Sequence, residues 1–530
     1  MKGLFYKRNM PLELIMIITF GVIIRIIAIF NLNIIEPDGI AYIQQARALL
    51  SGDFSGIFSC ELSYFSYFFP LSIIFIAGAY LIIGDWLIAG HVISCLFGSA
   101  MLIPLALILR RFFERKIVFL SVATFSILPI FVYTSIYILR DPVFIFFVTL
   151  GFYFFIRYLD EYKKQILIYS SLCFTLGTWA RIEGFFIIPI AAVFVIIYRY
   201  KDKFSHLLLF LALPVLVLLS LNISTINLYE ENATARENAY YLTSDYDSLK
   251  ESVHLLAFEA YQSLKTSRFL KKAWDQRWLV AVGEVIRNLI KALHYLFFFI
   301  LLLGLKEAWS FLKFDKRAIF ITSVAITGMI FTYVFCLQKW VAQPRYYAGI
   351  VLIPASVIIC CGFKRCLYLL ENRLNLNTRW SFLLVIAVIF IMCLPKDLKV
   401  GDKDKRVFRD IANEIKKNED TANAIKIATS FGRNNWINFY ANYDFLSASN
   451  APWCHMSKGL LWEFFPKDYE YFVMHIEKEK IDYLLWEQRF WPRGKFLFKS
   501  SKLDQYFDRI GEWYHPEGGD IVLYKRKKNP

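Results

Sequence analysis

The sequence is poor in the side chains from which proteins build structural metal sites. Its 530 residues include nine cysteines and seven histidines, and no C-x-x-C pair or His-rich spacing occurs among them. A structural zinc site needs clustered cysteines and histidines, so nothing in the sequence indicates one. The sequence also lacks an internal repeat and a low-complexity tract, which argues against a repeat array.

Charged residues are absent from long stretches of the chain. Hydrophobic residues make up 57% of the sequence, whereas soluble globular chains are about 45–50% apolar. Several windows of about 18–23 residues carry almost no charge, and a helix of that length spans a bilayer. The first window, Leu12–Asn31, is too long for a signal-peptide core and no small-residue cleavage site follows it, so we expect it to be retained. The pattern predicts a polytopic α-helical membrane protein.

The formal net charge of +16 comes mainly from the apolar part of the chain. The segment from Lys396 onward contributes little, with 24 Lys and Arg against 20 Asp and Glu. The remaining excess lies in short loops near Lys7 and at 110–116, 199–203, 313–317 and 364–373. Short basic loops stay in the cytoplasm, so the charge indicates topology and not binding to nucleic acid.

Alternating these loops predicts about 11–13 transmembrane helices within residues 1–395. The N-terminus is then cytoplasmic, and the expected location is the bacterial inner (plasma) membrane. The first external loop spans 33–69 and is acidic. The second spans 229–287 and is either a lid over a site or a solvated pair of amphipathic helices. An odd number of spans places residues 396–530 on the extracytoplasmic side.

The C-terminal segment, 396–530, has the character of a soluble domain. Helical periodicity marks 407–417, whereas 424–431, 481–487 and 520–526 are rich in the apolar residues typical of strands. We therefore expect an extracytoplasmic α/β domain after the membrane helices.

Four external turns carry ionisable or polar side chains at the same side of the membrane. They hold Asp38, the Arg140-Asp141 pair, Arg181 with Glu183, and Lys339 with Arg345 and Tyr346. Taken singly, charged residues beside membrane helices are usually interfacial anchors. Together they predict a polar site, because ionisable groups near apolar spans tend to face an interior or a cavity.

A carboxylate opposite a group of cations suits a reaction on a phosphate-bearing lipid. The cations would hold an anionic leaving group, which arginine does through paired hydrogen bonds. The carboxylate would take a proton from an attacking hydroxyl. Fixed cations beside the leaving phosphate would lower the barrier as charge develops there.

Five segments in order resemble the GT-C glycosyltransferases, the superfamily of the protein O-mannosyltransferases and the aminoarabinose transferases. The first loop shares the pattern Pro-Asp-Glu/Gly, Tyr, Ala, Gly-Asp. The five segments are EPDGIAYIQQARALLSGDF (36–54), FFPLSIIFIAGAYLIIGD (68–85), LRDPVF (139–144), LGTWARIEGFFIIP (176–189) and QPRYYAGIVLIPA (343–355). The resemblance covers about residues 1–395 and implies an inverting transferase that takes a sugar from a polyisoprenyl phosphate and transfers it to a glycan, lipid or protein acceptor.

The resemblance implies a role for each matching residue. Asp38 matches the general base of the superfamily, and Asp141 matches its second acidic residue, which would help bind a divalent metal or position substrate. Arg345, followed by Tyr346, matches an Arg-Tyr segment and is a candidate for the lipid phosphate. Further candidates for contact with substrate are Arg181, Glu183, Lys339 and Tyr42.

The sequence departs from the superfamily at two places in these segments. Gly39 stands where many members have a glutamate, so the first loop offers one carboxylate in place of two. Phe68 and Phe69 precede Pro70, where aminoarabinose transferases have a lysine, which argues against an aminoarabinose substrate. The chain also lacks a Trp-Trp-Asp motif, which argues against transfer of whole glycans.

Two other interpretations stay open from the sequence. A transporter or flippase of a lipid-linked substrate also needs polar groups in a helical bundle, although related halves and interrupted helices at the midplane are not apparent. A non-catalytic envelope assembly protein could use the C-terminal domain as its working part.

Overall fold

A computed structural model describes most of the chain. The described residues are 12–52, 71–198, 202–231, 250–256, 264–340, 343–419, 425–428, 434–443, 474, 476–478, 480–489 and 503–527. They form two compact units. The first, here called the helical unit, falls within 1–29, 70–72 and 91–399, and the second, the mixed unit, falls within 30–69, 73–90 and 400–530.

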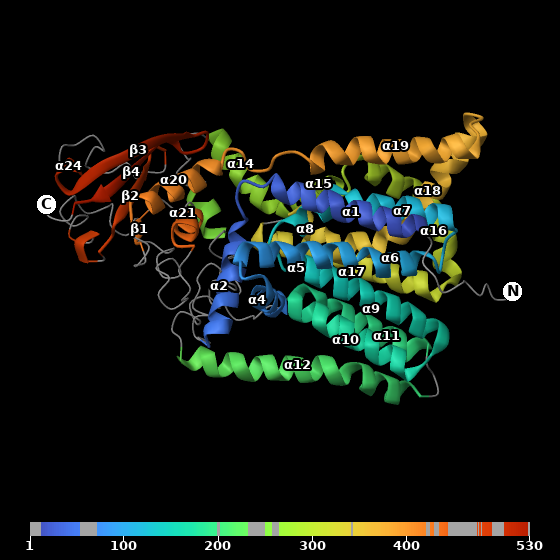
Figure 1. Cartoon of the computed structure of the whole chain (residues 1–530). Helices are drawn as coiled ribbons and strands as arrows, with labels where there is room; N and C mark the ends of the chain where they lie inside the picture. The colour runs from blue at the N-terminus through green and yellow to red at the C-terminus, as the bar shows by residue number, and fades with distance from the viewer. Residues whose placement is uncertain are drawn as a thin grey trace. The chain divides into compact units, whose positions relative to one another are not determined.

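The helical unit is a bundle of helices that runs from α1 to α19 (Figure 1). Its helices up to residue 231 are α1 (Leu12–Phe30), α5 (Trp86–Ala100), α6 (Leu102–Leu109), α7 (Arg115–Ile127), α8 (Pro129–Ile136), α9 (Asp141–Glu161), α10 (Lys164–Ala180), η1 (Ile182–Phe186), α11 (Ile187–Tyr198) and α12 (Lys203–Glu231). The later ones are α14 (Leu264–Asp275), α15 (Arg277–Ala292), α16 (Leu296–Phe314), α17 (Lys316–Lys339), η3 (Pro344–Tyr346), η4 (Ala348–Leu352), α18 (Ile353–Arg373) and α19 (Thr378–Asp397).

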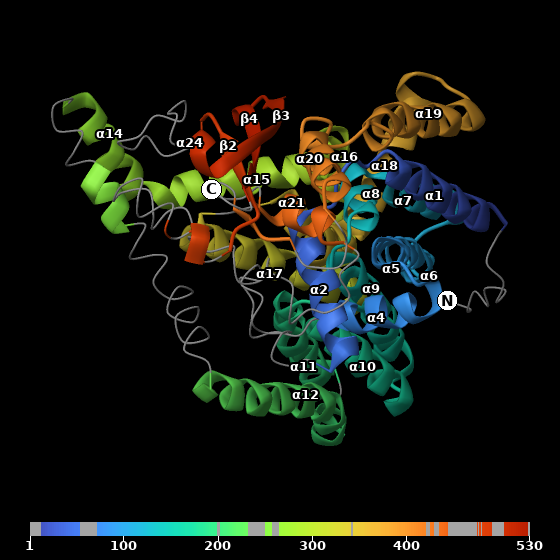
Figure 2. The same ribbon diagram turned by 60° about the vertical axis from the view of Figure 1, so that its left-hand side comes forward.

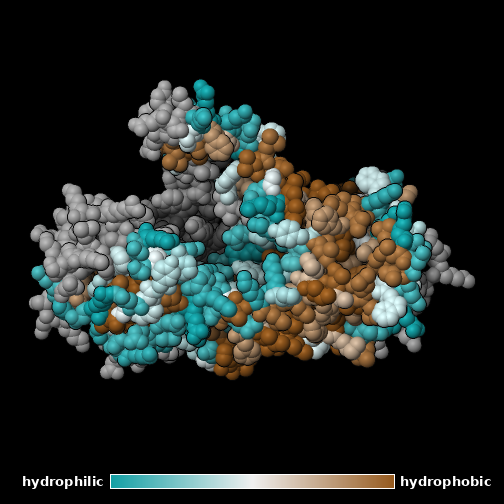
Figure 3. Space-filling view, turned by 90° about the horizontal axis from the view of Figure 1, so that it is seen from above, coloured by the Kyte–Doolittle hydropathy of each residue, from teal (hydrophilic) through white to brown (hydrophobic). Residues whose placement is uncertain are grey.

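Many helices of this unit are apolar on their outer surface as well as inside. Large apolar side chains such as Ile197, Phe314 and Ile391 are exposed, and Figure 3 shows hydrophobic residues covering much of the surface. Among the described residues, six helices are long and apolar enough to span a bilayer, or up to eight if each of two bent helix pairs is one span. The apolar helices at Leu71–Ile83, Ile182–Tyr198 and Lys203–Val217 are shorter. The predicted polytopic α-helical membrane fold is confirmed.

Two bends interrupt the bundle. The axis turns by 47° between α7 and α8 at Pro129, where the missing backbone N–H and the fixed φ of proline break the helix. It turns by 104° between α15 and α16, where His294 and Tyr295 have φ angles of 53° and 52°. Each bent pair is apolar enough to count as one span although neither is a single straight helix, which accounts for the difference between six and eight spans among the described residues.

The mixed unit combines helices from residues 30–90 with the C-terminal region. It includes α2 (Pro37–Ser51), most of α4 (Leu71–Ile83), α20 (Arg406–Lys417), α21 (Asn434–Ala441) and α24 (Leu503–Tyr506). Its four-stranded sheet has the order β1-β2-β4-β3, with β1 (Ile427–Ala428), β2 (Tyr483–Glu487), β3 (Phe507–His515) and β4 (Gly519–Arg526).

The sheet pairs β1 parallel to β2, while β2 and β3 are both antiparallel to β4. The helix predicted at 407–417 and the three predicted strands are confirmed as α20, β1, β2 and β4. Strand β3 was not predicted. Its residues alternate buried and exposed only irregularly, with a register shift between Arg509 and Gly511 that breaks the two-residue period.

Candidate active site

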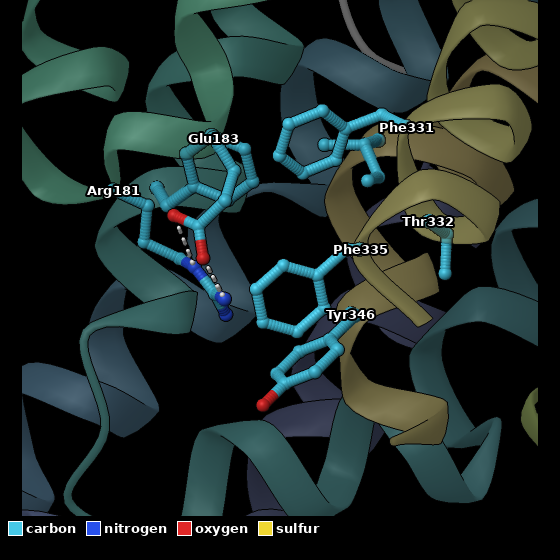
Figure 4. Close-up of a pocket in the computed structure, with 8 residues that line it drawn as sticks. Arg181, Glu183, Phe331, Thr332, Phe335 and Tyr346 are labelled. Atoms are coloured by element: carbon cyan, nitrogen blue, oxygen red, sulfur yellow. Dashed lines mark hydrogen bonds and ion pairs between the residues drawn. The ribbon is translucent and has the colours of Figure 1, made fainter. Parts of the chain in front are cut away.

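Three of the predicted site residues form one buried ionic cluster in the helical unit. The guanidinium of Arg181 donates from Nη1 to Asp141 Oδ1 and from Nη2 to Glu183 Oε1, the latter at 2.6 Å. Its Nε also donates to Glu183 Oε2 at 3.3 Å, so Glu183 is held by two hydrogen bonds. Figure 4 shows the two bonds between Arg181 and Glu183. The cluster therefore joins two of the four segments in which the sequence analysis noted ionisable residues.

The connection between α9 and α10 brings these residues together. The chain turns at Tyr162, which has a left-handed φ of 53°, so the two helices run antiparallel and the end of α10 returns to the start of α9. Asp141 begins α9, where the positive end of the helix dipole favours a carboxylate. Arg181 follows the last residue of α10 and therefore meets Asp141.

Burial makes the pairing in this cluster strong and mutual. The side chains of Arg181 and Asp141 are 7% and 5% exposed, and that of Glu183 is 17% exposed. Arg140 adds a second cation, with Nη2 4.0 Å from Glu183 Oε1. Glu183 lies in the turn that follows α10. Desolvation would raise the pKa of its carboxyl, but the charges of Arg181 and Arg140 outweigh it and hold that pKa at about 2.

A partly open aromatic pocket borders the ionic cluster. The pocket is lined by Phe144, Arg181, Glu183, Phe331, Thr332, Phe335, Tyr346 and Ile350. In Figure 4 the charged pair faces the rings of Phe331, Phe335 and Tyr346, which come from α17 and η3. The Arg181 guanidinium carbon lies 5.4 Å from the Tyr346 ring centre, within cation–π range. The pocket thus combines a charged end with apolar walls.

Two glycines allow the Phe144 ring to fill its place beside the cluster. A Cβ atom on Gly349 would lie 2.5 Å from Phe144 Cε1, and one on Gly184 would lie 2.9 Å from Phe144 Cε2. Both distances are shorter than a carbon contact can be, so a side chain at either position would force the ring to move. Gly184 of the segment LGTWARIEGFFIIP and Gly349 of the segment QPRYYAGIVLIPA are therefore both needed to leave room for the Phe144 ring.

The segment that carries Arg345 and Tyr346 is irregular. It follows Trp340, which ends α17 with a φ of 54°, and continues into the π-helical turn η4 before α18. The buried Tyr347 anchors it by donating its hydroxyl hydrogen to the Val285 carbonyl of α15 at 2.9 Å. Tyr346 thereby reaches the pocket, while Arg345 is partly exposed. Single π-turns inside helices are frequent at functional sites.

Two other predicted residues belong to the mixed unit. Asp38 and Tyr42 lie on α2 of the mixed unit, where Asp38 is half-buried in the first turn and Tyr42 is buried. Lys339 ends α17, but its side chain lies outside the described residues.

Sequence reasoning did not identify the aromatic walls. Phe331 and Phe335 are spaced by four residues, which in an apolar helix is indistinguishable from ordinary packing. Phe144 could have been predicted from the sequence, because it is the last residue of the LRDPVF segment and follows Asp141 by three residues.

The residues around Asp141 do not fit a divalent metal. Its Oδ1 accepts from Arg181, a cation that would repel a metal ion at the same carboxylate. Within the described part of the chain, no three His, Cys, Asp or Glu side chains come together as a ligand set. Gly39 also removes the second carboxylate from the first loop. No step of the reaction is therefore assigned to a metal.

Comparisons with known proteins agree with this fold. Residues 70–223 match the family described as dolichyl-phosphate-mannose-protein mannosyltransferase. No curated protein sequence matches the chain.

Solved structures match almost the whole chain. The archaeal oligosaccharyltransferase AglB from Archaeoglobus fulgidus, in complex with an inhibitory peptide and a dolichol-phosphate, has a TM-score of 0.54 at 13% identity, covering 98% of this chain and 74% of that one. ArnT from Cupriavidus metallidurans, bound to undecaprenyl phosphate, has a TM-score of 0.54 at 10% identity, covering 97% and 98%. A further structure of the Archaeoglobus enzyme, in complex with Zn and sulfate, has a TM-score of 0.56 at 13% identity, covering 96% and 73%.

The fold is thus of the GT-C type, and the resemblance to the superfamily of protein O-mannosyltransferases and aminoarabinose transferases is confirmed.

Proposed function

We propose that this integral membrane protein is a glycosyltransferase that moves a single sugar from a polyisoprenyl phosphate to an acceptor on the extracytoplasmic face. The observation that carries the proposal is the buried Arg181 cluster beside an aromatic pocket, within a fold whose relatives bind dolichol-phosphate or undecaprenyl phosphate. The N-terminus is cytoplasmic, and the membrane is the bacterial inner membrane. The acceptor offers a hydroxyl or an amine on a glycan, lipid or protein.

The pocket supplies the features that a lipid-linked donor needs. The rings of Phe331, Phe335 and Tyr346 offer apolar contact to the first isoprenyl units. Arg345 stands next to Tyr346 and is partly exposed, so its guanidinium is our candidate for the donor phosphate. Arg181 is already bound to two carboxylates, so we assign it to holding Asp141 and Glu183 in place.

The reaction is a single displacement at the anomeric carbon of the sugar. The acceptor atom attacks from the face opposite the phosphate, and the bond between that carbon and the phosphate oxygen breaks, leaving its electron pair on polyisoprenyl phosphate. Asp38 takes the proton of the acceptor as the new bond forms. The configuration at the sugar carbon inverts because one displacement occurs.

The test is turnover by the purified protein in nanodiscs with radiolabelled polyprenyl-phosphate sugars. Wild type should release polyprenyl phosphate, and Asp38→Asn should lose about 100-fold or more of that rate because it keeps the volume but not the base. The control variant Asp410→Asn removes an exposed carboxylate from α20 and should keep full activity. If liposomes containing the protein transport a lipid-linked sugar but no polyprenyl phosphate is released, the protein is a transporter and the proposal fails.

A further inference from the structure

The C-terminal part of the mixed unit holds the backbone directly before Asp38. The indole Nε1 of Trp436 donates to the Ile35 carbonyl at 2.8 Å, and the Ile35 N–H donates to the Tyr440 hydroxyl at 3.1 Å. Trp436, Tyr440 and Ile35 are all buried. Two side chains of one helix, α21, thus satisfy both backbone groups of a residue about 400 positions earlier in the chain.

A second set of contacts holds Leu32 and Asn33. Leu32 forms an isolated parallel β-bridge with Gly401. The side-chain amide of Asn33 donates to the Gly401 carbonyl at 2.6 Å, and Arg409 of α20 donates to the Asn33 carbonyl at 3.3 Å. Together with the bonds to Ile35, these contacts hold the loop from residue 32 to residue 35.

A third contact holds α2 near its other end. Arg47 is only 2% exposed and lies between the rings of Trp86 and Tyr443, with its guanidinium carbon 5.6 and 5.5 Å from their centres. Its Nη2 donates to the Tyr443 carbonyl at 2.9 Å. The Tyr443 hydroxyl accepts from the Leu87 N–H at 3.1 Å. Figure 2 shows α21 beside α2.

The backbone between Ile35 and Asp38 is short and has restricted dihedral angles, so holding Ile35 also restricts the position of Asp38. Glu36 is extended, with φ −67° and ψ 148°, and Pro37 begins α2 with the fixed φ of proline. Only these two residues separate Ile35 from Asp38, and α2 is itself held at Arg47. The backbone that leads into Asp38 is therefore held by α21.

We propose that Trp436 and Tyr440 are positioning residues for Asp38, and that this is a working role of the C-terminal region. The inference rests on the proposed function, in which Asp38 is the base. The indole and the hydroxyl are used within the protein, so this face of α21 serves the first loop and not a ligand. A displacement of about 1 Å at a reacting group costs roughly 100-fold in rate, so small changes here should be measurable.

The test compares Tyr440→Phe and Trp436→Phe with Tyr514→Phe. The first removes only the acceptor for the Ile35 N–H, and the second keeps a ring to stack on Phe408, which lies 5.6 Å from Trp436. Tyr514 is exposed in the same unit and serves as the matched control. In each variant, kcat, the KM for the donor and hydrogen–deuterium exchange of peptides covering 33–40 are measured.

We expect each of the two variants to lower kcat about 10-fold or more while the KM for the donor stays unchanged, and to speed exchange over 33–40. In an Asp38→Asn background neither substitution should lower the residual rate further, since both act through that carboxylate. Tyr514→Phe should leave kcat, the KM for the donor and the exchange over 33–40 unchanged.

Three results would overturn the inference, and they are distinguishable. An inactive wild-type protein overturns the proposed function and, with it, the positioning of a base. An active wild type whose Tyr440→Phe and Trp436→Phe variants keep full kcat overturns the positioning alone. Unchanged exchange over 33–40 in those variants would likewise show that α21 does not hold the loop.

Discussion

Two buried arginines, one in each unit, are held by different chemistry. Arg181 in the helical unit is held by the carboxylates of Asp141 and Glu183. Arg47 in the mixed unit contacts two aromatic rings and donates a hydrogen bond to a backbone carbonyl. Both side chains are more than nine-tenths buried.

These different partners indicate that Arg181 belongs to a charged site, whereas Arg47 has a structural role. Burying a guanidinium beside two carboxylates creates a polar centre whose members depend on one another, because each lost partner leaves an uncompensated charge. The rings and the carbonyl that contact Arg47 add no charge of their own, which suits a contact that holds two segments together. We therefore expect changes at Arg181 to act on the reaction and on stability, and changes at Arg47 to act mainly on stability.

The largest effect should follow from removing Arg181. Arg181→Ala leaves Asp141 and Glu183 without their shared cation, so we expect turnover to fall about 100-fold or more and the free energy of unfolding to fall by about 3–5 kcal/mol. The loss of activity is measured as turnover in nanodiscs, and the loss of stability is measured by thermal unfolding in detergent. Arg111→Ala, which breaks a partly exposed pair with Asp160 at 2.7 Å, should cost less than about 1 kcal/mol. Equal losses in the two variants would remove the distinction between this cluster and a surface ion pair.

A smaller loss should follow from Arg47→Met. Methionine keeps the apolar packing between Trp86 and Tyr443 but loses the hydrogen bond and the cation–π contacts, so we expect destabilisation of about 1–3 kcal/mol. Thermal unfolding measures the loss, and Arg406→Met on the exposed surface of α20 is the control. If Arg47→Met is as stable as wild type, Arg47 does not join α2 to the C-terminal region.

A loss of similar size should follow from adding one methyl group beside the ionic cluster. Gly349→Ala would press on Phe144, and we expect a loss of about 1–3 kcal/mol together with a higher KM for the donor, since that ring lines the pocket. Gly283→Ala in α15 meets no atom within 4 Å and should stabilise the helix by up to about 1 kcal/mol. Identical unfolding temperatures for the two variants would mean that Phe144 can move without cost.

The sequence was informative wherever the determining interaction is local. Apolar windows with few charges predicted the membrane helices, because every backbone polar group in a bilayer must be paired within its own helix. Arg181 and Glu183 were predicted as one feature because they are two residues apart in a turn. The helix at 407–417 and the strands of the C-terminal region followed from their periodicity, whereas β3 did not because its pattern is irregular.

Tertiary structure alone decided which distant residues meet. Phe331 and Phe335 became pocket walls because η3 and α10 place Tyr346 and Arg181 opposite them, and no spacing in α17 encodes that contact. Trp436 and Tyr440 hold Ile35 across about 400 residues, a pairing that depends on how whole segments pack. The sequence by itself therefore determined that this is a polytopic membrane protein with acids and cations close to the ends of its apolar segments. Packing determined that Arg181 neutralises Asp141 and that the C-terminal region holds the loop bearing Asp38, since long-range contacts depend on three-dimensional complementarity and not on local pattern.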